Sequence, residues 1–103
     1  MKEIYNDLFS QSFPSKEQLV EFALKRHGFC SDNGYSGVTY PEDLDEYDRI
    51  IESQYIPDGM VNINYWDGSY KEVMVSENDY LIALKIFLTL NGNENLASIL
   101  ITE

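Results

Sequence analysis

The sequence predicts an α+β fold in which a small antiparallel sheet, with a central hairpin at 60–75, is packed by about four to five helices. Two runs of β-favouring residues are joined by Asp67-Gly68, a dipeptide typical of hairpin turns. The apolar segment 77–90 follows directly and begins after a serine, Ser76, that can cap a helix. The length of 103 residues suits one domain, so a single domain is expected over 1–103.

The first half of the chain is expected to begin with two helices. Apolar residues at helical spacing indicate a short helix over 4–10. Ser15 and Gln18 have the spacing of a capping box, which predicts a second helix over 15–27. Gly28 is expected to end this helix in a left-handed conformation.

The middle and the end of the chain contain the other predicted elements. Turn-prone residues after 28 indicate a loop, in which 35–39 could form a third strand. Pro41 suits the first position of a helix, and 41–54 is expected to be helical. The hairpin strands are expected at 60–66 and 70–75, and 94–101 can form a closing helix.

Alternation along the strand 60–66 separates two faces of the sheet. The face expected to meet the core carries Val61, Ile63 and Tyr65. The face expected to meet water or a partner carries Met60, Asn62, Asn64 and Trp66. A lone hairpin is only marginally stable, so the apolar helix must cover it. The residues expected to do so are Leu81, Ile82, Leu84, Ile86, Phe87, Leu88 and Leu90. The buried stripe of the second helix is expected to be Leu19, Val20, Ala23 and Leu24.

The charge of the chain is strongly negative. Acidic residues outnumber Lys and Arg by 18 to 7, which gives a formal net charge of -11. Such a surface repels phosphate, so nucleic acid and anionic membranes are not expected as ligands. A basic protein is the natural complement, because opposite potentials steer association. The alternative explanation is that the acidity only keeps the protein in solution.

The acidic bias is strongest between Tyr40 and Gly59, where seven acids accompany a single base, Arg49. Neighbouring like charges destabilise a helix, so their retention suggests that the negative field is useful. Tyr40 and the seven acids are therefore the predicted contact surface for a Lys/Arg-rich protein. The acids are Glu42, Asp43, Asp45, Glu46, Asp48, Glu52 and Asp58. The alternative is a solvated helix face beside core tyrosines.

The sequence offers no signal of catalytic chemistry. His27 and Cys30 are the only histidine and cysteine, too few for a zinc site and without a visible positioning group for a nucleophilic pair. No calcium loop or phosphate-binding glycine loop is complete. A chain of this length also leaves little room for a substrate cleft. We therefore expect no enzyme activity, no metal, no cofactor and no small-molecule substrate.

The expected location is the cytoplasm. A lone cysteine forms no intrachain disulfide, which suits a reducing compartment. The first residues lack the basic and then apolar pattern of a signal peptide. No apolar run approaches the length needed to span a bilayer.

Several stretches of the second half carry a family resemblance. They are Tyr55-Ile-Pro-Asp-Gly-Met-Val, Tyr65-Trp-Asp-Gly, Val73-Met-Val-Ser-Glu and Tyr80-Leu. With them the chain, over 55–101, resembles small bacterial immunity proteins of contact-dependent growth inhibition and related polymorphic toxin systems. The resemblance implies a cytoplasmic protein that binds and neutralises one cognate toxin C-terminal domain, often a basic nuclease. It carries over no contact residues, so the predicted site comes from the charge argument alone.

Charge and resemblance lead to the same expectation. The helix near 42–52, with the loop before it, is expected to dock near the active cleft of the toxin and block substrate entry. The alternative is an acidic adaptor or regulatory subunit that binds a basic protein unrelated to toxins.

Overall fold

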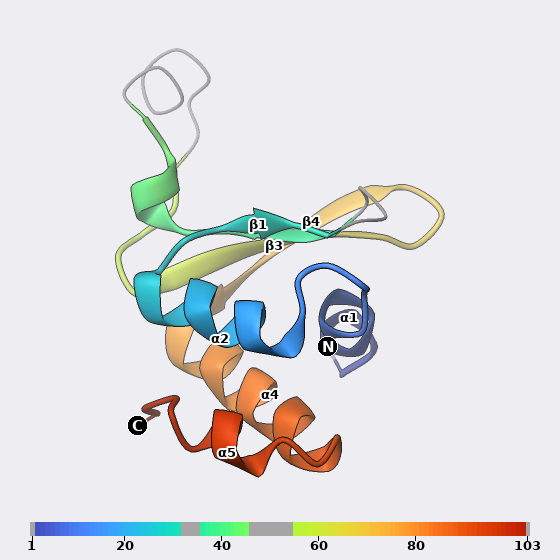
Figure 1. Cartoon of the computed structure of the whole chain (residues 1–103). Coiled ribbons are helices and arrows are strands. Elements are labelled where there is room, and N and C mark those ends of the chain that lie inside the picture. The colour runs from blue at the N-terminus through green and yellow to red at the C-terminus, as the bar shows by residue number, and fades with distance from the viewer. Residues whose placement is uncertain (1, 32–35, 46–54, 103) are drawn as a thin grey trace.

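The computed structural model describes residues 2–31, 36–45 and 55–102. Within them, four α-helices lie on one side of a four-stranded antiparallel sheet (Figure 1). The helices are α1 (Lys2–Phe9), α2 (Lys16–Lys25), α4 (Glu77–Leu90) and α5 (Glu94–Ala97). The strands are β1 (Phe29–Cys30), β2 (Gly37–Thr39), β3 (Met60–Trp66) and β4 (Tyr70–Ser76), and a short 3-10 helix, η1 (Pro41–Asp43), follows β2. The mixed α+β class is thus confirmed. No described helix is long and apolar enough to cross a membrane.

The predicted hairpin forms one side of the sheet and not its centre. The strand order is β1-β2-β3-β4, and each neighbouring pair is antiparallel. Trp66 pairs with Tyr70 across the turn, where Gly68 has a φ of +96° that favours glycine. β2 lies within the predicted third strand, whereas the two-residue β1 was not predicted from the sequence. β1 is too short to show alternation, so only pairing with β2 reveals it.

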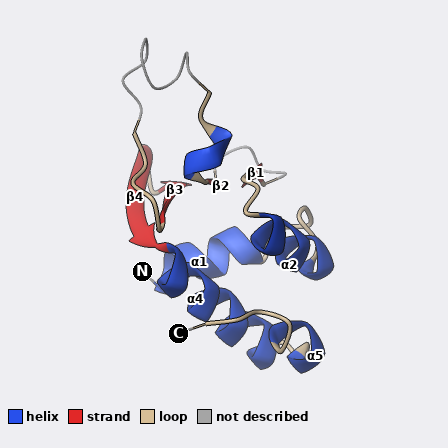
Figure 2. Ribbon diagram, turned by 90° about the vertical axis from the view of Figure 1, so that its left-hand side faces the viewer, coloured by secondary structure: helices blue, strands red, loops and turns tan. Residues whose placement is uncertain are grey.

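Figure 2 shows the helices gathered on one side of the sheet. The core is formed by side chains from both layers. Val61 and Ile63 of β3 are fully buried, which confirms the predicted inner face. They belong to one hydrophobic cluster with Leu84 of α4, Leu19 of α2 and Leu8 of α1. Burial of each such side chain contributes about 1.5–3 kcal/mol, so this cluster is the main source of stability.

Three residues expected in the core are instead exposed. Ile86 and Leu90 of α4 are 54% and 76% exposed, and Leu24 of α2 is exposed as well. The buried residues of α4, Tyr80, Leu84 and Leu88, recur every four residues. A helix turns by about 100° per residue, so side chains two positions away from this stripe point to the opposite side. The apolar composition of this segment did not indicate which side of α4 is buried and which is exposed.

The start of α2 agrees with the sequence, and its end does not. Ser15 Oγ accepts from Gln18 N at 3.1 Å, and Gln18 Oε1 accepts from Ser15 N at 2.9 Å, so the capping box is confirmed. The left-handed residue at the end is Arg26, with φ 52° and ψ 47°. Gly28 was predicted for this role; the structure uses it for a close approach of backbone segments.

The predicted helix over 41–54 is wrong at its beginning. Only the 3-10 turn Pro41–Asp43 forms, and Leu44 after it has an extended backbone with ψ 124°. The buried side chain of Leu44 and the hydrogen bonds of Asp43 hold this turn in place. Residues 46–54 of the predicted helix lie outside the described residues. The closing helix is also shorter than expected, because α5 ends at Ala97.

Candidate functional site

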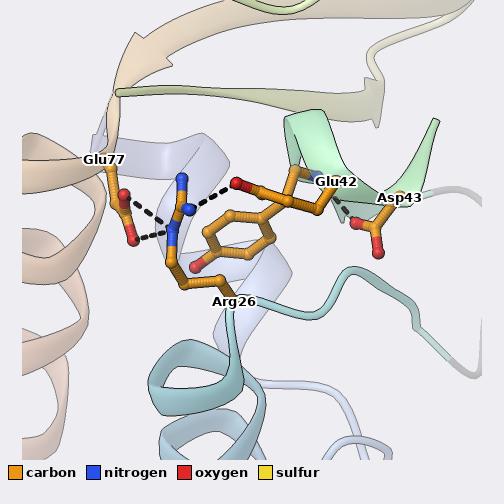
Figure 3. A network of polar contacts seen from close by, with 5 residues as sticks. Arg26, Glu42, Asp43 and Glu77 are labelled. Carbon is orange, nitrogen blue, oxygen red and sulfur yellow. Dashed lines mark hydrogen bonds and ion pairs between the residues drawn. The ribbon is translucent and has the colours of Figure 1, made fainter. Parts of the chain in front are cut away.

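The described part of the acidic segment is held against the domain by Arg26. Its Nε donates to Glu77 Oε2 at 3.0 Å and Oε1 at 3.1 Å, at the first residue of α4. Its Nη1 donates to Glu42 Oε1 at 2.5 Å, in η1. Figure 3 shows the guanidinium between the two carboxylates. One side chain therefore joins three elements that are far apart in the sequence.

An aromatic ring lies under this ion-pair network. The guanidinium carbon of Arg26 is 5.6 Å from the ring centroid of Tyr40, a distance suited to a cation–π contact. The Tyr40 ring also meets Tyr80 edge to face, with the centroids 6.4 Å apart. Tyr40 is only 1% exposed, and its hydroxyl has no hydrogen-bond partner among the described residues.

The electrostatics of the network follow from burial and charge. Burial is the main cause that raises the pKa of Tyr40, and the negative charge of Glu77 adds to it. For Arg26, partial burial lowers the pKa, but the hydrogen bonds and charges of Glu77 and Glu42 offset this and leave the pKa raised. Arg26 is therefore a permanent cation between two acids.

Asp43 makes the second attachment of the segment. Its Oδ2 accepts from the backbone N of Tyr40 at 2.7 Å and from the backbone N of Gly28 at 2.9 Å. At Gly28 a Cβ would collide with this carboxylate and with the carbonyl of Val38. A side chain at position 28 would separate the chain after α2 from η1, which explains the glycine.

The structure gives different roles to the predicted contact residues. Tyr40 is buried, so its side chain offers no accessible surface for the contact predicted from the sequence. Glu42 and Asp43 are exposed, but both are engaged in internal contacts. Asp45 and Asp58 are exposed on either side of the undescribed stretch. The remaining three, Glu46, Asp48 and Glu52, lie outside the described residues.

A hollow of about 290 Å³ lies where the acidic segment meets the sheet. Its lining comes from the segment, through Leu44, Tyr55 and Ile56, and from the sheet, mainly through Asn62, Glu72 and Met74. The sequence predicted that Asn62 faces water or a partner, but the involvement of Glu72 was missed. The hairpin turn sets the pairing of Trp66 with Tyr70, and hence of Asn64 with Glu72. The strand register implied by the hairpin turn could therefore have predicted that Glu72 lies on the same face as Asn64.

The part of the chain that the structure describes contains no group of three or more His, Cys, Asp or Glu side chains placed to hold a metal ion. Comparisons of the chain with protein-family models, with curated proteins and with solved structures give no match. The fold and the site together define a small α+β protein in which the described parts of an acidic segment are attached to the domain beside one face of the sheet.

Proposed function

We propose that this chain is a cytoplasmic immunity protein that binds a cognate basic toxin domain, a nuclease in the simplest case, and neutralises it through its acidic surface. The observation that carries the proposal is the bias of seven acids to one base between Tyr40 and Gly59. Both flanks of this segment are attached to the domain, at Asp43 and, through buried Ile56, beside the sheet.

The attachment has an energetic consequence for binding. A segment whose ends are held loses less conformational freedom when it meets a partner, and this saving appears as affinity. Arg26 and Asp43 thus support binding indirectly, by holding the backbone of η1 against the domain. The proposed contacts include the exposed Asp45 and Asp58, together with the three acids outside the described residues.

The proposed mechanism is electrostatic occlusion. A nuclease needs a positive surface to hold the phosphates of its substrate. Carboxylates bound to that surface take the place of the phosphates and so exclude the nucleic acid. Association of the two proteins should then be fast and should slow with added salt, because opposite potentials steer the encounter.

The deciding experiment first asks whether a gene beside the one for this chain encodes a basic toxin domain; the absence of such a gene would count against the proposal. The purified domain is mixed with the chain, and complex formation and nucleic-acid cleavage are measured at increasing salt. The proposal expects a stoichiometric complex that stops cleavage and associates more slowly at high salt. A toxin that remains fully active with saturating amounts of the chain would overturn it. A stable complex with a basic protein whose activity is unchanged would instead support an adaptor.

A further inference from the structure

The sheet has one face without an α-helix over it in the described parts of the chain. All four α-helices lie on the opposite side (Figures 1 and 2). The register places Thr39, Asn62 and Met74 side by side across three strands on this face. In the same way Asn64 lies opposite Glu72. All five of these residues line the hollow of about 290 Å³.

The polar groups in the hollow have unused hydrogen-bonding capacity. Glu72 and Asn62 form no side-chain hydrogen bond or ion pair with any described residue. Asn64 donates its amide nitrogen to the hydroxyl of Tyr70, which leaves its amide oxygen as an acceptor. The hollow therefore presents one carboxylate and two amide oxygens to an incoming group, and its lining includes no Lys or Arg from the described residues.

Apart from Thr39, the remaining walls are apolar or aromatic. Leu44 and Ile56 are buried at one side, and Met74 is part of the other. The ring of Tyr55 stands at the rim and is 75% exposed. Carboxylate, amide oxygens, aliphatic walls and an aromatic face are the surroundings that suit a long cationic side chain with an apolar stem.

We infer that this hollow binds an arginine side chain of the protein partner. The guanidinium offers five donors in a planar fork, which can engage the Glu72 carboxylate through two parallel hydrogen bonds and reach the Asn62 oxygen. Its aliphatic stem lies against Met74, and its plane can stack on the exposed ring of Tyr55. A lysine offers a single ammonium without this planar match, so arginine is the preferred occupant.

The inference rests on the proposed function in one respect, namely that the partner is basic. The acidic segment and the hollow adjoin each other, because Leu44, Tyr55 and Ile56 belong to the segment and also line the hollow. A partner held by the acids of this segment would present its surface to Glu72. The segment supplies the long-range field, and the hollow supplies a specific anchor.

The test is a titration of the isotope-labelled full chain with the peptide acetyl-Gly-Arg-Gly-amide, followed by NMR. Two control peptides replace arginine by citrulline, its neutral near-isostere, or by lysine. Chemical-shift changes are expected at the amides of Asn62, Glu72 and Met74. Binding of the arginine peptide should be at least about five-fold tighter than that of the citrulline peptide, since a partly exposed charged pair contributes about 1 kcal/mol.

The variant Glu72→Gln keeps the size of the side chain and removes its charge, and should weaken arginine binding by about five-fold. Its matched control is Glu94→Gln, which removes one charge at an exposed position of α5 and should leave binding unchanged. Asn62→Ser serves as a second variant and should also weaken binding of the arginine peptide. Equal binding of the citrulline peptide, or equal losses in Glu72→Gln and Glu94→Gln, would overturn the inference.

The inference and the proposed function can fail separately. If the toxin domain is neutralised with the same affinity by the Glu72→Gln protein, the anchor is wrong and the immunity function stands. If the arginine peptide binds at Glu72 but the chain leaves the toxin active, the anchor stands and the immunity function is wrong.

Discussion

Arg26 and Glu77 meet through two hydrogen bonds of 3.0 and 3.1 Å although they are 51 positions apart in the sequence. The contact joins the end of α2 to the first turn of α4, where a carboxylate also complements the helix dipole. Arg26 reaches this position with a left-handed backbone, a conformation that is unfavourable for residues with a side chain. The network in Figure 3 thus keeps a strained residue in place.

Two substitutions of Arg26 should distinguish the stability gained from its ion pairs from the stability lost to its left-handed backbone. Arg26→Ala is expected to lower the free energy of unfolding by about 2 kcal/mol, because two carboxylates lose a charged donor. Arg26→Gly should lose about 1 kcal/mol less, since glycine adopts a positive φ without strain. Urea denaturation measures both. Lys25→Ala is the control, because the Lys25–Glu21 pair is exposed and should contribute less than about 0.5 kcal/mol. A larger loss in Arg26→Gly than in Arg26→Ala would contradict this account.

Removal of the Asp43 carboxylate should destabilise the domain more than removal of an exposed acid. Asp43→Ala leaves the backbone N–H groups of Tyr40 and Gly28 without their acceptor, at a cost of about 2 kcal/mol. Asp43→Asn retains an oxygen acceptor and should cost less. Asp58→Asn, at an exposed turn, is the control and should change stability by less than about 0.5 kcal/mol. Thermal and urea unfolding of the three variants provide the measurement, and equal effects of Asp43→Ala and Asp58→Asn would refute the assignment.

Tyr40→Phe is expected to stabilise the protein by about 1 kcal/mol. The hydroxyl of Tyr40 is buried without a hydrogen-bond partner among the described residues, so its removal relieves a desolvation cost and keeps the ring contacts. Tyr55→Phe is the control, at a site that is 75% exposed, and should be close to neutral. Equilibrium unfolding in urea compares them. A clear loss of stability in Tyr40→Phe would show that the hydroxyl has a stabilising partner.

Stability should decrease as the pH rises above about 10, the ordinary pKa of tyrosine. Burial raises the pKa of Tyr40 and that of Tyr80, and burial together with the charge of Asp79 raises that of Tyr5. Above pH 10 the unfolded chain therefore releases protons that the folded chain retains. The unfolded state then binds fewer protons, and the free energy of unfolding falls with pH.

Two measurements test this pH dependence. The urea midpoint should be lower at about pH 11 than at about pH 8. Absorbance at about 295 nm should show tyrosines that ionise only when the protein unfolds. Tyr40→Phe should make the decrease shallower. A stability that is constant across this range, or unchanged in slope by Tyr40→Phe, would contradict the prediction.

Reversal of charge on the acidic segment should weaken binding of the basic toxin domain. The double variant Asp45→Lys, Asp58→Lys is expected to slow association at low salt by about ten-fold, because the steering field is reduced. The control Glu17→Lys, Glu94→Lys has the same net charge but changes the helical side of the molecule. Stopped-flow association rates compare the two. Equal slowing in both proteins would mean that net charge, and not this segment, governs the encounter.

The sequence determined the features that depend on neighbours along the chain. The hairpin turn at Asp67-Gly68, the capping box of Ser15 and Gln18, and the inner face of β3 were all predictable, because local propensity and alternation decide them. The negative charge between Tyr40 and Gly59 was equally visible. These features led to the fold class and to the acidic segment as a candidate surface.

Only the tertiary structure decided which described residues of this segment make contacts within the domain. Glu42 pairs with Arg26, Asp43 holds backbone amides, and Tyr40 is buried, and each role depends on a partner that the sequence does not place nearby. Likewise, Glu72 joins Asn62 at one hollow only through the register of the sheet. Propensity is a property of short segments, whereas burial and pairing depend on contacts between distant ones, and this difference separates what could be predicted from what had to be observed.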